Sequence, residues 1–173
     1  MSNVFHFTYN EQQIAYEVTG KGKALVILHG WGSSRRVMMP IARQLAHLRS
    51  SYVLDLPGFG DSNEPVTAWT IDDYADAVLA FIEKLPDDRV DLLVHSFGGR
   101  IALKLLAREK GKKIIEKVLI TGGAGMKPRR SWKYYFKKYT AKTLKAPFVI
   151  LPEPLRSKAL NWLRSTDLWK SLG

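Results

Sequence analysis

A chain of 173 residues with 46% hydrophobic and 25% charged residues is long enough for one ordinary domain and too apolar for a disordered polar chain. Cysteine is absent, which excludes a disulfide framework and a thiolate metal site. The net charge of +11 is concentrated near the C-terminus, because residues 1–125 carry 15 Lys and Arg against 14 Asp and Glu, whereas residues 126–173 carry 12 against 2.

The chain is expected to begin with an antiparallel hairpin. Residues 4–9 and 14–18 alternate, or nearly alternate, apolar and polar side chains around a polar turn, which is typical of strands with one wet face. The apolar run 24–28 follows, and an uninterrupted run predicts a strand buried on both faces. This strand ends in a glycine-rich turn, His29 to Gly32.

The next part alternates helix and strand patterns. Residues 36–48 predict a helix that tolerates Pro40 in its first turn if it begins late. Its apolar residues are Val37, Ile41, Leu45 and Leu48. Residues 51–56 predict a short strand, and Thr70 with Asp73 resembles the N-terminal cap of a second helix. The apolar face of that helix comprises Ile71, Tyr74, Ala75, Val78, Phe81, Ile82 and Leu85.

A buried strand at residues 90–94 turns sharply at Ser96, and residues 101–107 continue as a helix. A further strand is predicted at residues 115–121. A hairpin followed by alternating strands and helices predicts an α/β fold with a mostly parallel sheet and helices on both of its faces.

Two strand ends carry candidate chemistry. The turn at Ser96 has the logic of a nucleophile elbow, although Val94 stands where the usual G-x-S-x-G pattern has its first glycine. The turn around Gly30 is either plain tight geometry or a place where backbone N–H groups face a developing oxyanion, with the Trp31 N–H as the best candidate. Both turns are expected at the carboxyl edge of the parallel sheet, where α/β sites form. Their pairing favours an active site.

Three motifs, taken together, resemble the α/β-hydrolase fold superfamily of the serine-nucleophile type. They are His29-Gly30-Trp31-Gly32, Asp55-Leu56-Pro57-Gly58-Phe59-Gly60-Asp61-Ser62 and His95-Ser96-Phe97-Gly98-Gly99. The resemblance covers residues 4 to about 125. It implies two domains, an incomplete hydrolase core at residues 1–125 and a basic helical cap segment at residues 126–173.

The resemblance implies acyl transfer from a small-molecule substrate to water, without a cofactor or metal. Ser96 would attack the carbonyl carbon, and the backbone N–H groups of Trp31 and Phe97 would stabilise the oxyanion. The residues expected to contact the substrate are His29, Gly30 and His95. Serine at the elbow disfavours the dehalogenase and epoxide hydrolase chemistry of the family, which uses a carboxylate. Ester, thioester, lactone, peptide and carbon–carbon substrates stay open.

The family's base is missing. Its triad places an acid and then a histidine after the serine, but no histidine follows Ser96. The histidines are His6, His29, His47 and His95, and the later acids are Glu109, Glu116, Glu153 and Asp167. We therefore expect a truncated chain that ends inside the cap, lacks the last core strands and has impaired ester hydrolysis. The alternative is a non-catalytic binding or interaction protein.

The missing strands would leave residues 118–121 as an exposed apolar sheet edge, which predicts self-association or pairing with a C-terminal piece. Arg100, after the elbow, could meet a substrate anion, but a salt bridge on the helix surface is the commoner fate of such a residue.

The basic segment has two interpretations. Its aromatic residues Trp132, Tyr135, Phe136 and Tyr139 recur at helical spacing among lysines, and Leu160, Trp162 and Leu163 follow in a second helical stretch. We favour aromatics that pack the cap onto the site, with the lysines solvated. The alternative is a basic amphipathic helix on an anionic membrane surface or an acidic partner. No nucleic-acid module is recognised, so no nucleic-acid partner is expected.

A cytoplasmic location is expected. No apolar run approaches the roughly 18 residues that a membrane-spanning helix needs, and residues 1–20 lack the pattern of a signal peptide.

Overall fold

A computed structural model describes residues 4–123, 132, 135, 136, 139, 140, 143, 147 and 151–166. It divides into two compact units, Met1–Met126 and Lys127–Gly173. The strands of the first unit are β1 (Val4–Tyr9), β2 (Gln12–Thr19), β3 (Lys23–Leu28), β4 (Arg49–Leu54), β5 (Val90–His95) and β6 (Ile115–Thr121). Its helices are α1 (Arg35–Gln44), α2 (Ile71–Ile82), α3 (Phe97–Leu106) and α4 (Glu109–Ile114).

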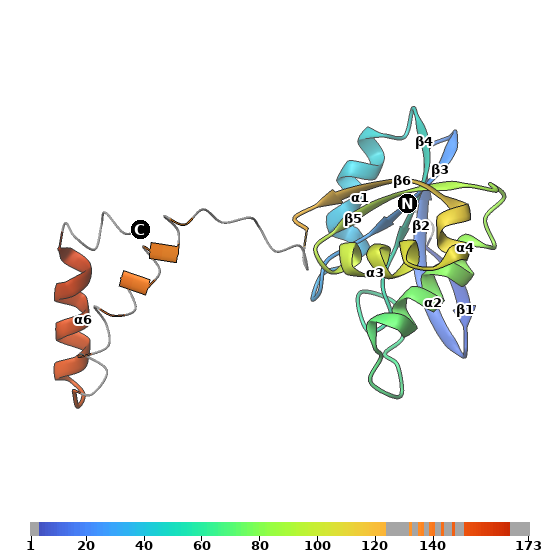
Figure 1. Ribbon diagram of the computed structural model, residues 1–173. Coiled ribbons are helices and arrows are strands. Elements are labelled where there is room, and N and C mark those ends of the chain that lie inside the picture. Colours follow the sequence, from blue (N-terminus) through green and yellow to red (C-terminus); the bar gives the residue numbers. More distant parts are fainter. Residues whose placement is uncertain are drawn as a thin grey trace. The chain divides into compact units, whose positions relative to one another are not determined.

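The six strands form one sheet in the order β1-β2-β4-β3-β5-β6 (Figure 1). The hairpin strands β1 and β2 are antiparallel, and β2 joins β4 antiparallel. The pairs β3–β4, β3–β5 and β5–β6 are parallel. The predicted α/β fold, with its N-terminal hairpin and mostly parallel sheet, is therefore confirmed.

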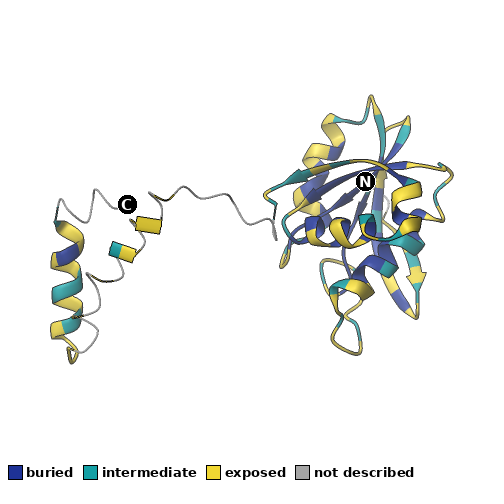
Figure 2. Cartoon of the chain, in the orientation of Figure 1, coloured by how far each residue is buried: buried dark blue, intermediate teal, exposed yellow. Residues whose placement is uncertain are grey.

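Apolar side chains of the central strands alternate between two cores. On one face, Val26, Leu92 and Val94 pack in a cluster with α2 and α3. On the other face, Ile27 and Leu93 pack in a cluster with α1. Because both faces are covered, β3 and β5 are mostly apolar, and Figure 2 shows both strands largely buried.

The prediction for α1 was wrong in two respects. The helix begins at Arg35, so Pro40 lies in its interior and not in its first turn. The side chains that face the sheet are Met38, Met39 and Ala42, whereas Val37 is 65% exposed. Two apolar sets at helical spacing compete in this segment, and only the position of the sheet decides which set is buried. Pro40 is exposed, so water can reach the carbonyl oxygen that loses its amide partner.

The prediction for α2 is confirmed. Thr70 and Asp73 form a reciprocal capping box, in which each side chain accepts a hydrogen bond from the other residue's backbone N–H. The buried face contains five of the expected residues, Tyr74, Ala75, Val78, Phe81 and Ile82, and also Ala77. This face packs in the same core cluster as α3. The cap and the apolar periodicity agree, which is why the sequence located this helix well.

The second unit is described at fewer positions. Its helix α6 spans Leu155–Ser165 and includes the predicted stretch from Leu160 to Leu163, of which Leu163 is buried and Trp162 is exposed. The aromatic residues Trp132, Tyr135, Phe136 and Tyr139 are all exposed. The lysines predicted to lie among them fall outside the described residues. Among the described residues, no helix is long and apolar enough to cross a membrane.

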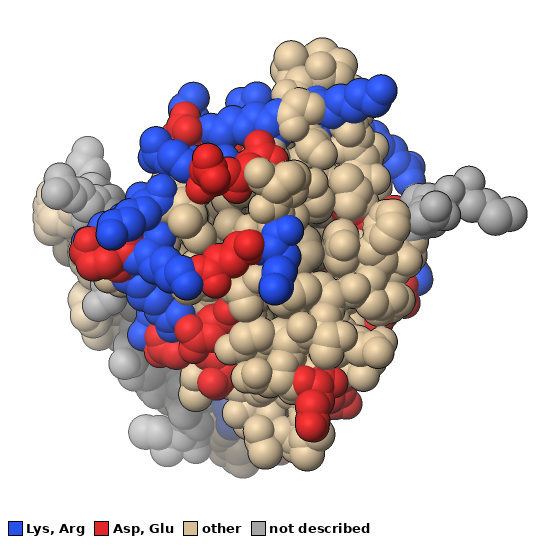
Figure 3. Space-filling view, turned by 90° about the vertical axis from the view of Figure 1, so that its right-hand side faces the viewer, with Lys and Arg blue, Asp and Glu red and all other residues tan. Residues whose placement is uncertain are grey.

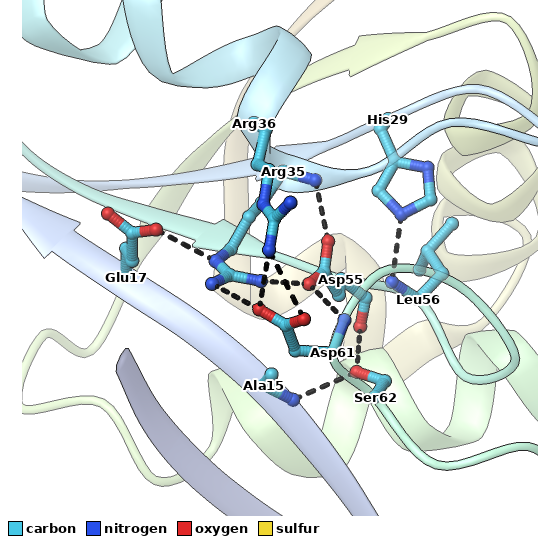
Figure 4. A network of polar contacts seen from close by, with 9 residues as sticks. All are labelled: Ala15, Glu17, His29, Arg35, Arg36, Asp55, Leu56, Asp61 and Ser62. Carbon is cyan, nitrogen blue, oxygen red and sulfur yellow. Dashed lines mark hydrogen bonds and ion pairs between the residues drawn. The ribbon is translucent and has the colours of Figure 1, made fainter. Parts of the chain in front are cut away.

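A buried ionic network ties the end of β4 to the start of α1 (Figure 4). The Arg35 guanidinium lies 2.9 Å from Glu17 Oε1 and 2.8 Å from Asp61 Oδ2, and it also pairs with Asp55. Asp55 accepts further hydrogen bonds from the backbone N–H groups of Arg35 at 2.6 Å and Asp61 at 2.9 Å. Ser62 donates to the Asp55 carbonyl oxygen at 2.7 Å. Asp55 and Asp61 thus hold the loop after β4 against the start of α1, and the hydrogen bond from Arg35 lowers the pKa of Asp61.

Arg35→Met should destabilise the protein strongly, because it leaves the buried Asp55 carboxylate without its cation. Removing one partner of a buried ion pair costs about 3–5 kcal/mol of unfolding free energy. Urea denaturation measures this loss. The neighbouring Arg36, whose side chain is 71% exposed, supplies the control, since Arg36→Met should cost no more than about 1 kcal/mol. Equal losses in the two variants would contradict this role of the network.

Candidate active site

Ser96 lies at the turn between β5 and α3, where its backbone has φ 45° and ψ −101°. A positive φ is unfavourable for a residue with a side chain, and such strain typically costs about 1–3 kcal/mol. The Ser96 N–H donates a hydrogen bond of 3.1 Å to the Thr121 carbonyl oxygen at the end of β6. The adjacent parallel strand therefore fixes the turn that displays the Ser96 side chain.

Close packing requires glycine at position 98. A β-carbon there would lie 2.8 Å from Leu28 Cβ and 2.9 Å from the Leu28 carbonyl oxygen. The Gly98 N–H instead donates to the His29 carbonyl oxygen at 3.2 Å. These contacts join the serine turn to the glycine-rich turn after β3. Val94, which departs from the usual pattern, is fully buried in the core below the turn, so its side chain is accommodated.

Two backbone N–H groups are available beside Ser96. A β-carbon on Gly30 would lie 3.4 Å from Ser96 Cβ, which shows how closely the two turns approach. The N–H groups of Trp31 and Phe97 donate to no acceptor among the residues that the structure describes. Phe97 is the first residue of α3, where the positive end of the helix dipole adds to the field. This arrangement can stabilise a negative oxygen near the serine.

A cavity of about 410 Å³ opens onto Ser96. Its lining residues are Trp31, Trp69, Ile71, Tyr74, Ser96, Phe97 and Arg100. The aromatic rings contact one another edge to face, with centroid distances of 5.0 Å for Trp31–Phe97, 5.2 Å for Tyr74–Phe97 and 5.3 Å for Trp69–Tyr74. These rings give the cavity an apolar wall.

Sequence reasoning missed Trp69 and treated Ile71 and Tyr74 only as part of a helix face. Tyr74 is 5% exposed, and its hydroxyl donates to the Pro57 carbonyl oxygen at 3.2 Å. Burial raises the pKa of this hydroxyl. The available signal was the cluster of aromatic residues at the start of α2, but spacing alone cannot separate core positions from cavity positions.

The two histidines near Ser96, His29 and His95, differ in burial and in their contacts. His29 is fully buried, and the Leu56 N–H donates to its Nε2 at 2.9 Å while its Nδ1 lies 2.7 Å from the Gly30 carbonyl oxygen. Burial lowers the pKa of His29. His95 is exposed, and its Nδ1 lies 3.2 Å from Thr121 Oγ1. Neither side chain is among those that line the cavity, whereas Gly30 adjoins Ser96.

A general base is not found beside Ser96 in the described part of the chain. The histidine ring contacts lie elsewhere, as above. Glu116 pairs with Lys23 at 2.6 Å, and Glu109 pairs with Lys112 at 2.6 Å. Glu153 in the second unit pairs with Arg156 at 2.7 Å, and Asp167 lies outside the described residues. Within the described residues, no cluster of His, Asp and Glu could hold a metal ion.

The chain is similar to several known hydrolases. It is 41% identical over 92 residues to the pimeloyl-[acyl-carrier protein] methyl ester esterase of Shewanella woodyi, a match covering 53% of this chain and 33% of the esterase. It is 32% identical over 93 residues to the soluble epoxide hydrolase of Corynebacterium sp. strain C12, covering 54% of this chain and 32% of that protein. The chain therefore spans about a third of the length of these two relatives.

Solved structures share the architecture. A bacterial membrane phospholipase A superimposes with a TM-score of 0.68 at 22% identity, covering 99% of this chain and 58% of that protein. At this identity the similarity concerns the fold. The model of the alpha/beta hydrolase fold family matches residues 23–170, which is most of the sequence. The chain belongs to the alpha/beta hydrolase fold family.

Proposed function

We propose that Ser96 is the nucleophile of an acyl hydrolase that acts on small ester-type substrates. Its Oγ forms a bond to the acyl carbonyl carbon, the carbonyl oxygen becomes an oxyanion, and the alcohol leaves with a proton. Water then cleaves the acyl-serine bond and restores the serine. The observation that carries this proposal is the strained Ser96 turn at a cavity, close to the N–H groups of Trp31 and Phe97, which donate to no acceptor among the described residues.

Those two N–H groups would form the oxyanion hole. Fixed donors need no reorganisation when charge develops, and removing one such donor typically lowers kcat by about 100-fold to 1000-fold. The esterase relative named above supports ester chemistry in this family. Serine in place of a carboxylate nucleophile argues against the alkyl-ester chemistry of the epoxide hydrolase relative.

We further propose that hydrolysis by this chain is slow, because a serine hydroxyl without a positioned base is a poor nucleophile. In this proposal, solvent accepts the Ser96 proton. An oxyanion hole with bound substrate can still accelerate a reaction by about 1000-fold to 10,000-fold over water. The competing function is a non-catalytic binding protein that uses the same cavity.

A fluorophosphonate probe separates the two functions. We expect slow, covalent labelling of the folded chain at Ser96, complete loss of labelling in Ser96→Ala, and unchanged labelling in Ser34→Ala. Ser34 is a suitable control because its side chain makes no capping hydrogen bond at the start of α1. Intact-protein mass spectrometry measures the adduct. Absence of any adduct on the folded protein would favour the binding function.

His29, on this proposal, positions the oxyanion turn and does not transfer protons. Its ring joins the turn after β3 to the loop after β4 through Gly30 and Leu56, and both of its nitrogens are occupied. His95 would contact the substrate only if the substrate extends past the serine toward Thr121. Each role follows from where the ring lies.

The buried His29 should make stability depend on pH. Burial lowers the pKa of His29 in the folded state. Below pH about 6.5, His29 therefore binds a proton more readily in the unfolded chain than in the folded chain. The unfolding free energy should therefore fall between pH 7.5 and 5.5, by at most about 1.4 kcal/mol per pH unit for this one group. Urea denaturation of His29→Gln should show a smaller pH dependence. His47→Gln, at an exposed position, should keep the full dependence, and the reverse pattern would refute this role.

We also propose that a further strand adds to the outer edge of β6, either from a second copy of the chain or from a separate C-terminal piece. Among the described strands, β6 pairs only with β5. Leu119 is 60% exposed, although its register partner Leu93 is 4% exposed and packs in the α1 cluster. An apolar, unpaired edge favours association.

Light scattering over a concentration series tests this edge. The average mass should rise with concentration, and Leu119→Lys should weaken the rise because a charged side chain opposes strand addition. Leu103→Lys, on the exposed side of α3, is the matched control and should leave association unchanged. A monomer at all concentrations would count against self-association, and mixing with the corresponding C-terminal piece of a relative would then test the other partner.

A further inference from the structure

Three basic residues follow one another along α3 and the turn after it, at intervals of one helical turn: Arg100, Lys104 and Arg108. Lys104 pairs with Asp72 of α2 at 2.8 Å. Arg108 pairs with Asp72 at 3.2 Å and also with Asp76. Basic and acidic side chains are likewise interleaved on the face drawn in Figure 3. Two of these three basic residues, Lys104 and Arg108, thus form ion pairs with acidic residues of α2.

Arg100 differs from Lys104 and Arg108 in its ion pairing. Among the described residues, no acidic side chain lies within ion-pairing distance of its guanidinium. The position one turn before Asp72 is occupied by Ala68, ahead of the start of α2, so the acidic row of α2 ends before it reaches Arg100. The helix-surface salt bridge expected for Arg100 is thus not formed within the described structure. An exposed cation is left at the serine end of α3.

The unpaired cation lines the cavity of the nucleophile. Ser96 and Arg100 line the same cavity, and Arg100 lies in the first turn of α3, directly after the serine turn. Between them the cavity wall is apolar, since it is formed by Phe97, Ile71 and Trp69. The site thus combines a reactive group, an apolar wall and a positive end.

We propose that Arg100 determines specificity by binding a carboxylate on the substrate, so that the preferred substrates are esters with an apolar body and a carboxylate a few bonds away from the reacting carbonyl. This inference rests on the proposed function of Ser96 and names the substrate class of that site. A planar guanidinium can bind a carboxylate through two parallel hydrogen bonds, whereas a neutral substrate gains nothing from it. Aromatic rings along the wall contact the apolar body.

Binding of a matched pair of ligands tests the inference without any need for turnover. The ligands are 4-phenylbutanoate and its neutral amide, which have the same shape and differ in charge. Their dissociation constants are measured by ligand-detected NMR at a fixed ionic strength of about 0.15 M, where long-range attraction is screened. The wild-type chain should bind the carboxylate about tenfold more tightly than the amide, as one charge-assisted pair implies.

Arg100→Gln should abolish this preference and leave affinity for the amide unchanged, and Arg100→Lys should keep only part of it. Lys104→Gln, one turn along α3 and engaged with Asp72, controls for the loss of a positive charge and should keep the full preference. Equal loss in Arg100→Gln and Lys104→Gln would indicate general electrostatic attraction and overturn the proposal. A preference that Arg100→Gln leaves intact would overturn it as well.

The binding test and the labelling test together separate this inference from the proposed chemistry. Binding can also be measured with Ser96→Ala, which lacks the proposed nucleophile. If Arg100 discriminates between the ligands but the fluorophosphonate does not label Ser96, the anion subsite stands and the hydrolase function fails. If Ser96 is labelled but Arg100 does not discriminate, the hydrolase function stands and the substrate class is wrong.

Discussion

The close contact between the ends of β3 and β5 is the constraint on which the site depends. Gly98 lies against Leu28 so tightly that no β-carbon fits, and its N–H is bonded to the His29 carbonyl oxygen. Because the two strands are adjacent and parallel, their end turns must meet at the same edge of the sheet. The contact brings the turn that carries Trp31 next to the turn that carries Ser96 and Phe97. Together with the hydrogen bond from the Ser96 N–H to the Thr121 carbonyl oxygen, it holds the strained serine turn in place.

Buried polar contacts also hold the loop after β4 at this edge of the sheet. The loop after β4 is held by Asp55, which is fully buried and bound to Arg35, and by His29, which is bound to Leu56 (Figure 4). Buried charges are tolerated only when they are paired and hydrogen-bonded, so Asp55 and Arg35 serve to stabilise the fold. A buried histidine with both nitrogens occupied is likewise unable to serve as a base. The same interactions that build the site therefore occupy both ring nitrogens of His29.

The cavity beside Ser96 combines an apolar wall with one basic side chain. Aromatic residues from three segments, around Trp31, Trp69 and Phe97, form its wall, and Arg100 is a cation without a described counterion. Lys104 on α3 and Arg108 just after it are paired with acidic residues of α2. The electrostatic contrast between Arg100 and its neighbours supports a site that selects charged acyl substrates, while the absence of a described base beside Ser96 supports slow chemistry. Both proposals concern the same turn and can be separated experimentally.

The sequence by itself determined the elements whose signals are local. An uninterrupted apolar run located β3, a mostly apolar run located β5, the Thr70–Asp73 box located α2, and the glycines around Ser96 located the turn. The sequence order of these elements was also enough to predict a mostly parallel sheet, because parallel strands need helical crossovers.

Only the tertiary structure decided which side chains from distant segments meet. It buried Met38 and Met39 and exposed Val37, since the helix spacing of α1 fits two faces and the sheet covers one. It placed Trp69 at the cavity of Ser96, enclosed His29 between two loops, and aligned the acids of α2 with Lys104 but not with Arg100. Such pairings depend on the packing of α2 against α3 and of strand ends against each other, and residue spacing along one segment contains no measure of those distances.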